Sequence, residues 1–397
     1  MTALPRRLLL GAALLAATVT VTACTPDAEP AAAASLDGMV PRFEGDLSWP
    51  TLSPTWIIGP GTGVAVDSRD HIWVLHRPDP ERLSEEYVQS KQNPAIEGCC
   101  VRAQPLIEID QQGNVVQAMG SVEPDPNWPR QPHGVYVDHN DFVWVATSIY
   151  HQVMKFSRTG EHLLTIGEFD RTEGSANTEF LGGAAGVYVD PETNELFVAD
   201  GYNNSRVIVF NAETGQYLRH WGAYGNVPED RPRGGGQGGG QGGGAPGAGA
   251  QAPPPPPDTT MPAQFNLPHG IKGSKDGHIY VADRGNSRVQ VFTRAGEFVR
   301  EARVRAGGGG AFDVAFSPDA EQHFLYVADG NQHKIWILVR STLEVVGSFG
   351  EEGAGPGQFQ RPHNIASDSH GNLYVAEADP GFRWQRVPFR EMIARQP

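Results

Sequence analysis

Cysteine, positive charge and long apolar runs are all scarce in this 397-residue chain. Lys and Arg number 31 against 46 Asp and Glu, which gives a formal net charge of −15. Because binding to a phosphate backbone needs a basic surface, this balance argues against a nucleic-acid partner. Helical heptads are also absent, whereas glycine, proline and short runs rich in Val, Ile and Tyr abound. This composition predicts many short strands joined by turns.

Residues 1–23 have the pattern of an export signal, with Arg6 and Arg7, an apolar run from Leu8 and small residues before Cys24. The ending Val-Thr-Ala-Cys resembles the lipobox of bacterial lipoproteins, which implies cleavage before Cys24 and acylation of its thiol. A plain secretory signal is the alternative. No other run approaches the roughly 20 apolar residues that span a bilayer. We therefore expect an exported cell-envelope lipoprotein on the extracytoplasmic face, membrane-bound only through its lipid.

Export also limits what the two remaining cysteines, Cys99 and Cys100, can do, because an oxidising compartment favours disulfides. Adjacent cysteines pair only through a strained vicinal ring, so we expect either that ring or two buried thiols. A metal site made of cysteines is not expected.

A repeated pattern runs through most of the chain: a strand ending near Asp, a polar turn, a strand such as "YVAD", a turn, and a strand such as "RVQVF". Six copies occur, and they begin at Gly63, Gly134, Gly186, Gly270, Asp313 and Asn364. No copy could bury both faces of its sheet alone, so the copies must pack around an axis. The sequence therefore predicts an all-β fold, a six-bladed β-propeller.

The expected organisation is a signal peptide over 1–23, a flexible tether over 24–45 and the propeller over 46–397. A Gly- and Pro-rich insert over 228–262 cannot bury apolar surface and is expected to be a disordered loop between the third and fourth blades. The segment Ser53–Gly59 resembles the outer strands of other copies. We expect it to complete the last blade and close the ring.

Histidine recurs at one position of the repeat. The residues that precede the opening residue of each copy are Thr62, His133, Ala185, His269, Phe312 and His363. Alternate blades of a six-fold ring are related by about 120°, so three imidazoles in alternate blades can converge on the axis. Three imidazoles suit a catalytic metal with an open coordination position, with zinc first and other late first-row divalent metals possible in principle. The alternative is that each histidine caps a turn.

A second position of the repeat follows the "YVAD" strand. It holds Arg77, Ser148, Gly201, Arg284, Gly330 and Ala378 in chain order. Arg77 and Arg284 therefore face each other across the ring, with Tyr202 on the same rim. The pattern predicts a cationic mouth with a phenol beside the metal. Surface arginines in turns, next to an aromatic residue, are the alternative.

These residues resemble a known family. The stretches "PHGVYVDHNDFVWVATS", "LFVADGYNNSRVIVF", "LPHGIKGSKDGHIYVADRGNSRVQVF" and "RPHNIASDSHGNLYVAEA" are similar to the catalytic core of peptidyl-α-hydroxyglycine α-amidating lyase, a six-bladed propeller of NHL repeats. The resemblance spans roughly Gly63 to Glu377.

The resemblance implies catalytic zinc on His133, His269 and His363, Tyr202 as the base, and Arg77 and Arg284 beside it and the substrate. The implied reaction cleaves the carbon–nitrogen bond of a peptide ending in α-hydroxyglycine, giving the peptide amide and glyoxylate. The hydroxylated peptide would come from a separate monooxygenase.

The sequence departs from the family at two points. The family's structural calcium would use backbone carbonyls of Val64 and Val135 and an aspartate, but that aspartate is Asn364 here, so calcium is left open. A family cysteine is Asn203, so its disulfide is missing. Two other functions stay open: a non-catalytic NHL propeller that binds a protein or cell-envelope ligand, and a zinc hydrolase using the same site.

Overall fold

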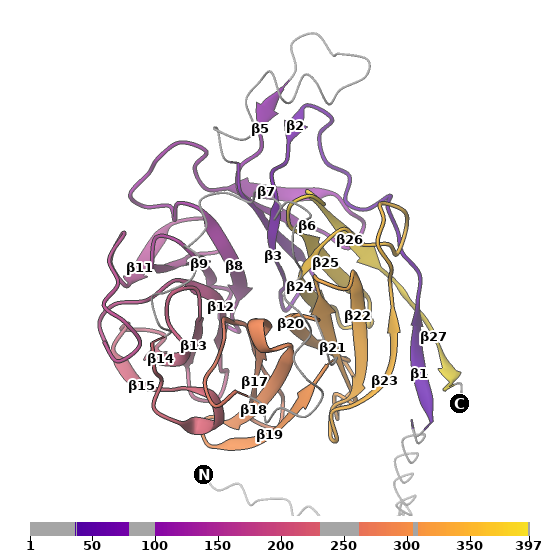
Figure 1. The fold of residues 1–397 in the computed structure, drawn as a ribbon. Coiled ribbons are helices and arrows are strands. Elements are labelled where there is room, and N and C mark those ends of the chain that lie inside the picture. The colour runs from indigo at the N-terminus through magenta and orange to yellow at the C-terminus, as the bar shows by residue number, and fades with distance from the viewer. Residues whose placement is uncertain (1–35, 37, 79–99, 231–261, 305–308, 396–397) are drawn as a thin grey trace, which may run out of the picture. The chain divides into compact units, whose positions relative to one another are not determined.

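The computed structural model describes residues 36, 38–78, 100–230, 262–304 and 309–395. Within the compact unit that begins at Gly38, six antiparallel sheets are arranged as the blades of a propeller (Figure 1). The predicted all-β, six-bladed propeller is confirmed.

Each blade runs outward from the axis in chain order. The first blade consists of β3 (Gly61–Val66), β4 (Ile72–His76), β6 (Leu106–Ile109) and β7 (Val115–Met119). The second consists of β8 (Pro132–Val137), β9 (Val143–Thr147), β10 (Val153–Phe156) and β11 (His162–Ile166). The third consists of β12 (Ala184–Val189), β13 (Glu195–Asp200), β14 (Arg206–Asn211) and β15 (Tyr217–Trp221), and the fourth of β16 (Pro268–Gly273), β17 (His278–Asp283), β18 (Arg288–Thr293) and β19 (Phe298–Arg303). The fifth is β20 (Ala311–Phe316), β21 (Phe324–Asp329), β22 (Lys334–Val339) and β23 (Glu344–Phe349), and the sixth is β24 (Pro362–Ser367), β25 (Leu373–Glu377) and β26 (Arg383–Val387). Two 3₁₀ turns lie in loops, η1 (Ala223–Gly225) after β15 and η2 (Arg284–Asn286) between β17 and β18.

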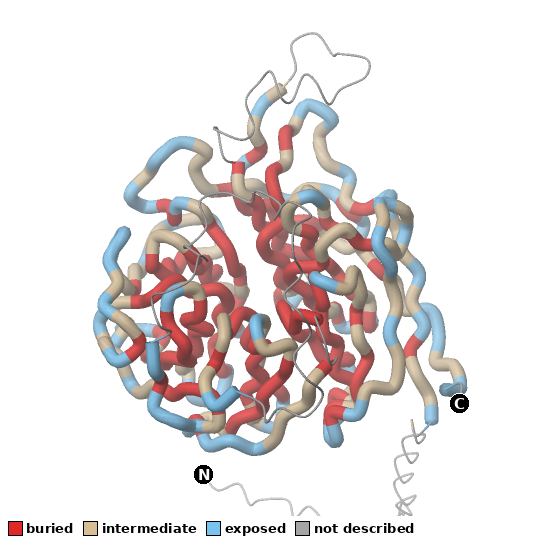
Figure 2. Tube along the Cα trace, in the orientation of Figure 1, coloured by how far each residue is buried: buried red, intermediate tan, exposed pale blue. Residues whose placement is uncertain are grey.

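Burial falls from the inside of each blade to the outside (Figure 2). Second strands such as β4 and β9 are buried at every position, because both faces pack against neighbouring blades. Outermost strands such as β7 and β11 bury only some of their residues. Continuous apolar runs inside and mixed runs outside are what stacked sheets require.

The ring is closed by a different segment from the one expected. Ser53–Gly59 does not join the last blade; its strand β2 (Trp56–Ile57) pairs in parallel with β5 (Val101–Arg102). Instead β1 (Met39–Phe43) pairs with β27 (Phe389–Ala394), and Asp46 bridges to Arg386 of β26. The N- and C-terminal segments therefore do meet, but the N-terminal strand lies inside the predicted 24–45 tether. The prediction for Ser53–Gly59 was wrong because it relied on the outer-strand pattern, which β1 lacks.

The residues on either side of the Gly- and Pro-rich insert hold each other. The side chain of Gln264 donates to the Val227 carbonyl at 3.1 Å, and Asn226 donates to the Ala263 carbonyl at 3.3 Å. Most of the insert, 231–261, lies outside the described residues. So do the predicted signal segment and Cys24. Among the described residues no helix has the length and apolar character to cross a membrane.

Candidate metal centre

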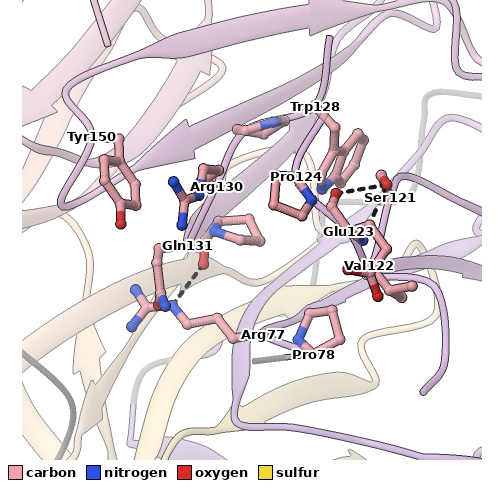
Figure 3. A pocket seen from close by; sticks show the side chains of 12 residues that line it. Arg77, Pro78, Ser121, Val122, Glu123, Pro124, Trp128, Arg130, Gln131 and Tyr150 are labelled. Carbon is pink, nitrogen blue, oxygen red and sulfur yellow. Dashed lines mark hydrogen bonds between the residues drawn. The ribbon is translucent and has the colours of Figure 1, made fainter. Parts of the chain in front are cut away.

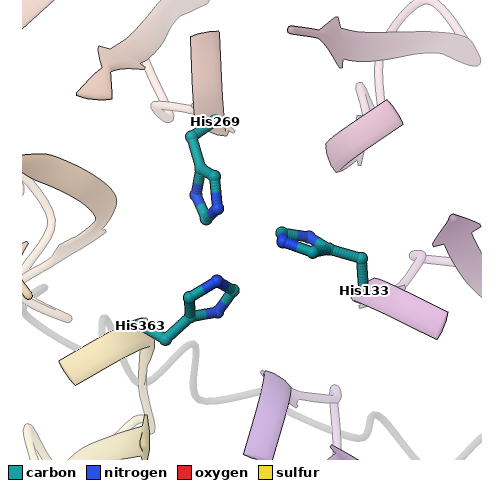
Figure 4. A group of neighbouring side chains, drawn as sticks. All are labelled: His133, His269 and His363. Atoms are coloured by element: carbon teal, nitrogen blue, oxygen red, sulfur yellow. The ribbon is translucent and has the colours of Figure 1, made fainter. Parts of the chain in front are cut away.

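A β-bulge turns each of the three histidines out of its strand. On β8, Pro132 pairs with Thr147 and Gly134 pairs with Ala146, so His133 between them has no partner across the ladder. The same register shift falls at His269 on β16 and at His363 on β24. A bulge re-aims the side chain of its extra residue. The innermost strands thereby direct three imidazoles at one point on the axis (Figure 4).

The three rings form a compact, buried group. Their centroids are 4.7–4.8 Å apart, and one ligand nitrogen from each lies within 4.8 Å of the others. His133 and His269 are 1% exposed and His363 is 5% exposed. The predicted convergence of the three side chains is present in the structure.

Each ring is oriented by the blade next to it. Nδ1 of His133 donates to the Ala185 carbonyl at 2.8 Å, and Nδ1 of His269 donates to the Phe312 carbonyl at 2.7 Å. Nδ1 of His363 donates in the same way to the Thr62 carbonyl at 2.9 Å.

These three carbonyls come from the histidine position in the other three blades. With the proton held on Nδ1, Nε2 keeps its lone pair, as a metal-ligating histidine requires. The six bulges therefore form three pairs. In each pair one bulge carries the histidine, and the bulge of the following blade supplies the carbonyl that accepts the Nδ1 hydrogen bond.

All three imidazoles are held neutral. Burial lowers the pKa of His133 and of His269 well below the usual value, and neighbouring positive charges lower both further. Burial, with Arg284, Arg361 and Arg77, lowers the pKa of His363 to about 3. Neutral imidazole is the form that binds a metal.

The donor set fits a divalent cation. Nε2 of His269 is buried and has no hydrogen-bond partner among the described residues, which is costly unless an ion takes its lone pair. Three neutral imidazoles with no carboxylate match a catalytic site that keeps one position open.

Tyr202 and Arg284 reach the histidines from two rim loops. The Tyr202 hydroxyl donates to Nε2 of His133 at 2.7 Å, and the Tyr202 ring packs edge-on against that imidazole. The Arg284 guanidinium hydrogen bonds to Tyr202 and stacks on the Phe312 ring at 3.9 Å. Burial lowers the pKa of Arg284, although its contact with Tyr202 opposes that effect. The phenol therefore contacts both the Arg284 cation and an imidazole of the buried histidine group.

Buried ion pairs set the positions of these two loops. Arg206 pairs with Asp200 at 2.9 Å, and Arg288 pairs with Asp283 at 2.8 Å, all four side chains being fully buried. The remaining nitrogens of Arg206 bond to loop carbonyls such as that of Ser175. In Arg288, Nη2 donates to the Gln264 carbonyl and Nη1 to the Tyr224 hydroxyl. No role was predicted for these two arginines, which end the stretches "DGYNNSR" and "ADRGNSR". The sequence signal for these ion pairs was an Asp before each rim loop and an Arg after it.

Arg77 is bonded to the strand that carries His133. Its Nε donates to the Pro132 carbonyl at 2.9 Å, and an Nη donates to the Ser148 hydroxyl at 3.0 Å. Pro132 is the residue immediately before His133, so Arg77 is tied to the bulge that carries this histidine. The two arginines therefore approach the metal centre from different blades, as the register predicted.

A second group of potential ligands, Asp67, His71 and Glu108, already contains a cation. Arg158 pairs with Asp67 at 2.7 Å and also contacts Glu108, while His71 hydrogen bonds to Glu108 at 2.6 Å. The guanidinium occupies the place between the carboxylates. This group is an ion-pair network that joins blades rather than a metal site.

The channel position implied for calcium does not fit that ion. Val64 and Val135 are buried on β3 and β8, but Asn364 brings no charge, and its Nδ2 donates to Asp313 at 2.9 Å. Asp313 in turn lies 3.8 Å from the Lys272 ammonium. Asp313, the carboxylate that Asn364 contacts, therefore already has a cation beside it.

The cysteine prediction falls mostly outside the described residues. Cys99 is among the residues that are not described, while Cys100 is disulfide-bonded. Cys100 lies at the start of the segment that packs beside Ile57, away from the histidines.

Solved structures share the fold. A gluconolactonase from Xanthomonas campestris superposes with a TM-score of 0.52 at 11% identity, covering 84% of this chain and 87% of that one. A virginiamycin B lyase from Staphylococcus aureus gives a TM-score of 0.50 at 12% identity, covering 87% and 99%. At these identities the likeness shows only the propeller architecture.

Sequence relatives are more specific. The NHL repeat family profile matches residues 181–210 and 265–292, which are strands of the third and fourth blades. Peptidyl-glycine alpha-amidating monooxygenase B of Xenopus laevis is 26% identical over 359 residues, 87% of this chain and 36% of its own length. The chain thus spans about a third of that relative. Peptidyl-alpha-hydroxyglycine alpha-amidating lyase 2 of Drosophila melanogaster is 30% identical over 356 residues, 86% of this chain and 73% of its own. The chain therefore belongs to the peptidyl-α-hydroxyglycine α-amidating lyase family.

Proposed function

We propose that this protein cleaves N-acyl-α-hydroxyglycine, the end of a hydroxylated peptide or a related carbinolamide, to the acyl amide and glyoxylate. The observation that carries the proposal is the contact of Tyr202 with both His133 of the buried imidazole group and Arg284. A base beside a metal ligand, stabilised by a fixed cation, is what removal of a hydroxyl proton requires.

His133, His269 and His363 would hold the metal, and we propose zinc because three neutral imidazoles leave it an open position. When bound, the ion supplies Lewis acidity that makes the α-hydroxyl of the substrate more acidic. The histidines themselves stay neutral and fixed through their bonds to the neighbouring blades.

The Tyr202 hydroxyl that donates to Nε2 of His133 must first lose its proton to act as a base, and Arg284 stabilises the resulting negative charge on the phenolic oxygen. Tyr202 then takes the hydroxyl proton of the substrate. The O–H electron pair then forms the carbonyl of glyoxylate as the carbon–nitrogen bond breaks. Its electrons pass to the amide nitrogen, which receives the proton back from Tyr202. Atoms and electrons balance without an oxidant or a water molecule.

Arg77 would bind the carboxylate of the hydroxyglycine. Its attachment to Pro132 and Ser148 fixes the guanidinium plane, and arginine binds carboxylates through parallel hydrogen bonds. A carboxylate held there would lie near His133, because Arg77 is bonded to the residue before it.

We further propose that the protein is exported, anchored through Cys24 and supplied by a separate monooxygenase. The support is the sequence of residues 1–24 together with the need of this reaction for a hydroxylated substrate. Incorporation of a labelled fatty acid that is lost in Cys24→Ala would support the anchor. Equal labelling of both proteins would refute it.

The test is glyoxylate release from N-acetyl-α-hydroxyglycine. We expect release that stops after chelation, returns with zinc and is lost in His269→Ala, while the exposed-histidine control His370→Ala keeps it. Release from substrates that lack the hydroxyl would instead indicate a hydrolase. Protein that contains no stoichiometric metal and releases no glyoxylate would indicate a non-catalytic propeller.

A further inference from the structure

A pocket opens next to Arg77, on the rim between the first two blades. It has a volume of about 190 Å³ and is lined by residues of the loops that follow β4, β7 and β9. The volume lies below the roughly 300–1,000 Å³ of sites for drug-sized ligands, so it suits a group the size of one side chain.

Two residues that line the pocket also lie next to the metal centre. Arg77 and Pro132 both line it, and they are joined by a hydrogen bond of 2.9 Å. Pro132 precedes His133, whose imidazole Arg77 also affects electrostatically. A substrate held by Arg77 therefore has this pocket as its neighbour.

One wall of the pocket is cationic. Arg130 stacks on the Tyr150 ring at 5.0 Å, and Tyr150 in turn stacks on Phe169 with ring centroids 4.7 Å apart. No ion pair within the described part of the chain involves Arg130. Figure 3 shows Tyr150, Arg130 and Arg77 along one side of the pocket.

The opposite wall adds little negative charge. Its acid, Glu123, pairs with Arg102 at 2.6 Å. Trp128, Pro124 and Pro129 supply apolar surface. The lining therefore combines two guanidinium groups, one neutralised carboxylate and hydrocarbon walls.

We infer that this pocket binds the side chain that precedes the hydroxyglycine, and that Arg130 selects an acidic one, a carboxylate on a short hydrocarbon stem such as glutamyl. This inference rests on the proposed lyase function and assigns its substrate class. The stem packs on Trp128 and the prolines, and the carboxylate reaches Arg130, whose stacking on Tyr150 fixes the guanidinium in advance.

The test compares N-acetyl-glutamyl-α-hydroxyglycine with its isosteric glutaminyl counterpart and with the lysyl compound. We expect kcat/KM for glutamyl to exceed that for glutaminyl by about tenfold, the size of a charge-assisted hydrogen bond. The ratio should fall to about one in Arg130→Gln, and Arg130→Glu should favour lysyl. The control Arg300→Gln, on the outer strand β19, should keep the wild-type ratio.

Turnover and preference are separate outcomes. Equal kcat/KM for the three substrates in the wild type would overturn the inference while leaving the lyase function standing. If no substrate releases glyoxylate, the lyase function fails, and calorimetry with N-acetyl-glutamylglycine and N-acetyl-glutaminylglycine decides the pocket. Tenfold tighter binding of the glutamyl probe that is lost in Arg130→Gln supports the pocket, and equal or absent binding of both overturns it.

Discussion

Tyr202 is the residue on which the proposed chemistry depends most. Tyr202→Phe keeps the edge-on ring contact with His133 but removes the hydroxyl that lies 2.7 Å from Nε2. We expect kcat to fall by about 10²–10⁴-fold, the usual contribution of a positioned acid or base, with metal content unchanged.

Glyoxylate assays and metal analysis of the same preparation measure both quantities for Tyr202→Phe. Tyr217→Phe removes a hydroxyl bonded to His220 on the outer strand β15 and is the matched control. An unchanged kcat in Tyr202→Phe would remove the tyrosine from the mechanism.

His76 provides a pH-dependent contribution to stability outside the metal centre. It is fully buried at the end of β4, where its Nδ1 accepts from the Gly59 amide and its Nε2 donates to the Gln104 carbonyl. Burial lowers its pKa to about 4, against 6.5 for an exposed histidine.

The unfolded chain therefore binds a proton at His76 between pH 6.5 and 4 that the folded protein does not bind. Stability is full above pH 6.5 and falls as the pH drops through this window. From pH 7 to 5 we expect a loss of about 2 kcal/mol from this group, at about 1.4 kcal/mol per pH unit. Urea unfolding should show a smaller pH-dependent loss in His76→Gln than in the wild type or in His370→Gln. Identical losses in all three proteins would exclude His76 as the cause.

At the scale of elements, the sequence predicted which side chains converge but not what directs them. The repeat register gave the three histidines and the two arginines because these are side-chain identities at fixed spacing. The bulges at His133, His269 and His363, and the carbonyls that hold their Nδ1 atoms, carry no residue signature, because any residue supplies a backbone carbonyl. The pocket beside Arg77 was missed for a related reason, since its lining comes from loops with no common pattern.

The loop that carries Tyr202 depends on a glycine at the start of the third blade. Gly183 has φ +107°, and an added Cβ would lie 2.4 Å from the Ser148 carbonyl and 2.8 Å from Cβ of Tyr202. Its carbonyl accepts from the Tyr202 amide at 3.2 Å. A side chain at this position must therefore displace the tyrosine, the serine or both.

We expect Gly183→Ala to lower kcat by about 10²-fold, since small misplacements of catalytic groups are that costly, while metal is retained. Glyoxylate assays with metal analysis measure both. Gly347→Ala is the control, because its Cβ would meet only the Ile337 side chain, at 3.8 Å. Normal turnover in Gly183→Ala would show that the loop tolerates the displacement.

At the scale of the whole molecule, the blades meet along a channel whose lining varies from blade to blade. Four innermost strands have glycine after the bulge, and at Gly134 and Gly186 a Cβ would collide with a carbonyl of the next blade, at 2.3 and 2.6 Å. The fifth and sixth blades have Asp313 and Asn364 there instead, and these two side chains bond to each other across the blades. The blades that carry Gly134 and Gly186 therefore pack closely against the next blade, whereas the last two blades are joined by the hydrogen bond between Asp313 and Asn364.

The Lys272 ammonium beside Asp313 gives the channel a built-in positive charge, so added calcium should not stabilise the protein. We expect the melting temperature of metal-loaded wild type to change by less than about 1 °C in millimolar calcium, since a ligand stabilises only what it binds. Lys272→Met with Asn364→Asp removes the ammonium and adds a second carboxylate beside Asp313, whose Oδ1 is buried without a hydrogen-bond partner among the described residues. In that double variant the melting temperature should rise with calcium by about 5 °C, at about 2–4 °C per kcal/mol of binding. Lys272→Met alone is the control, because it removes the ammonium and leaves Asn364 unchanged. A rise of the same size in the wild type would show that calcium binds despite Asn364 and Lys272, and that the ammonium does not take the place of the ion.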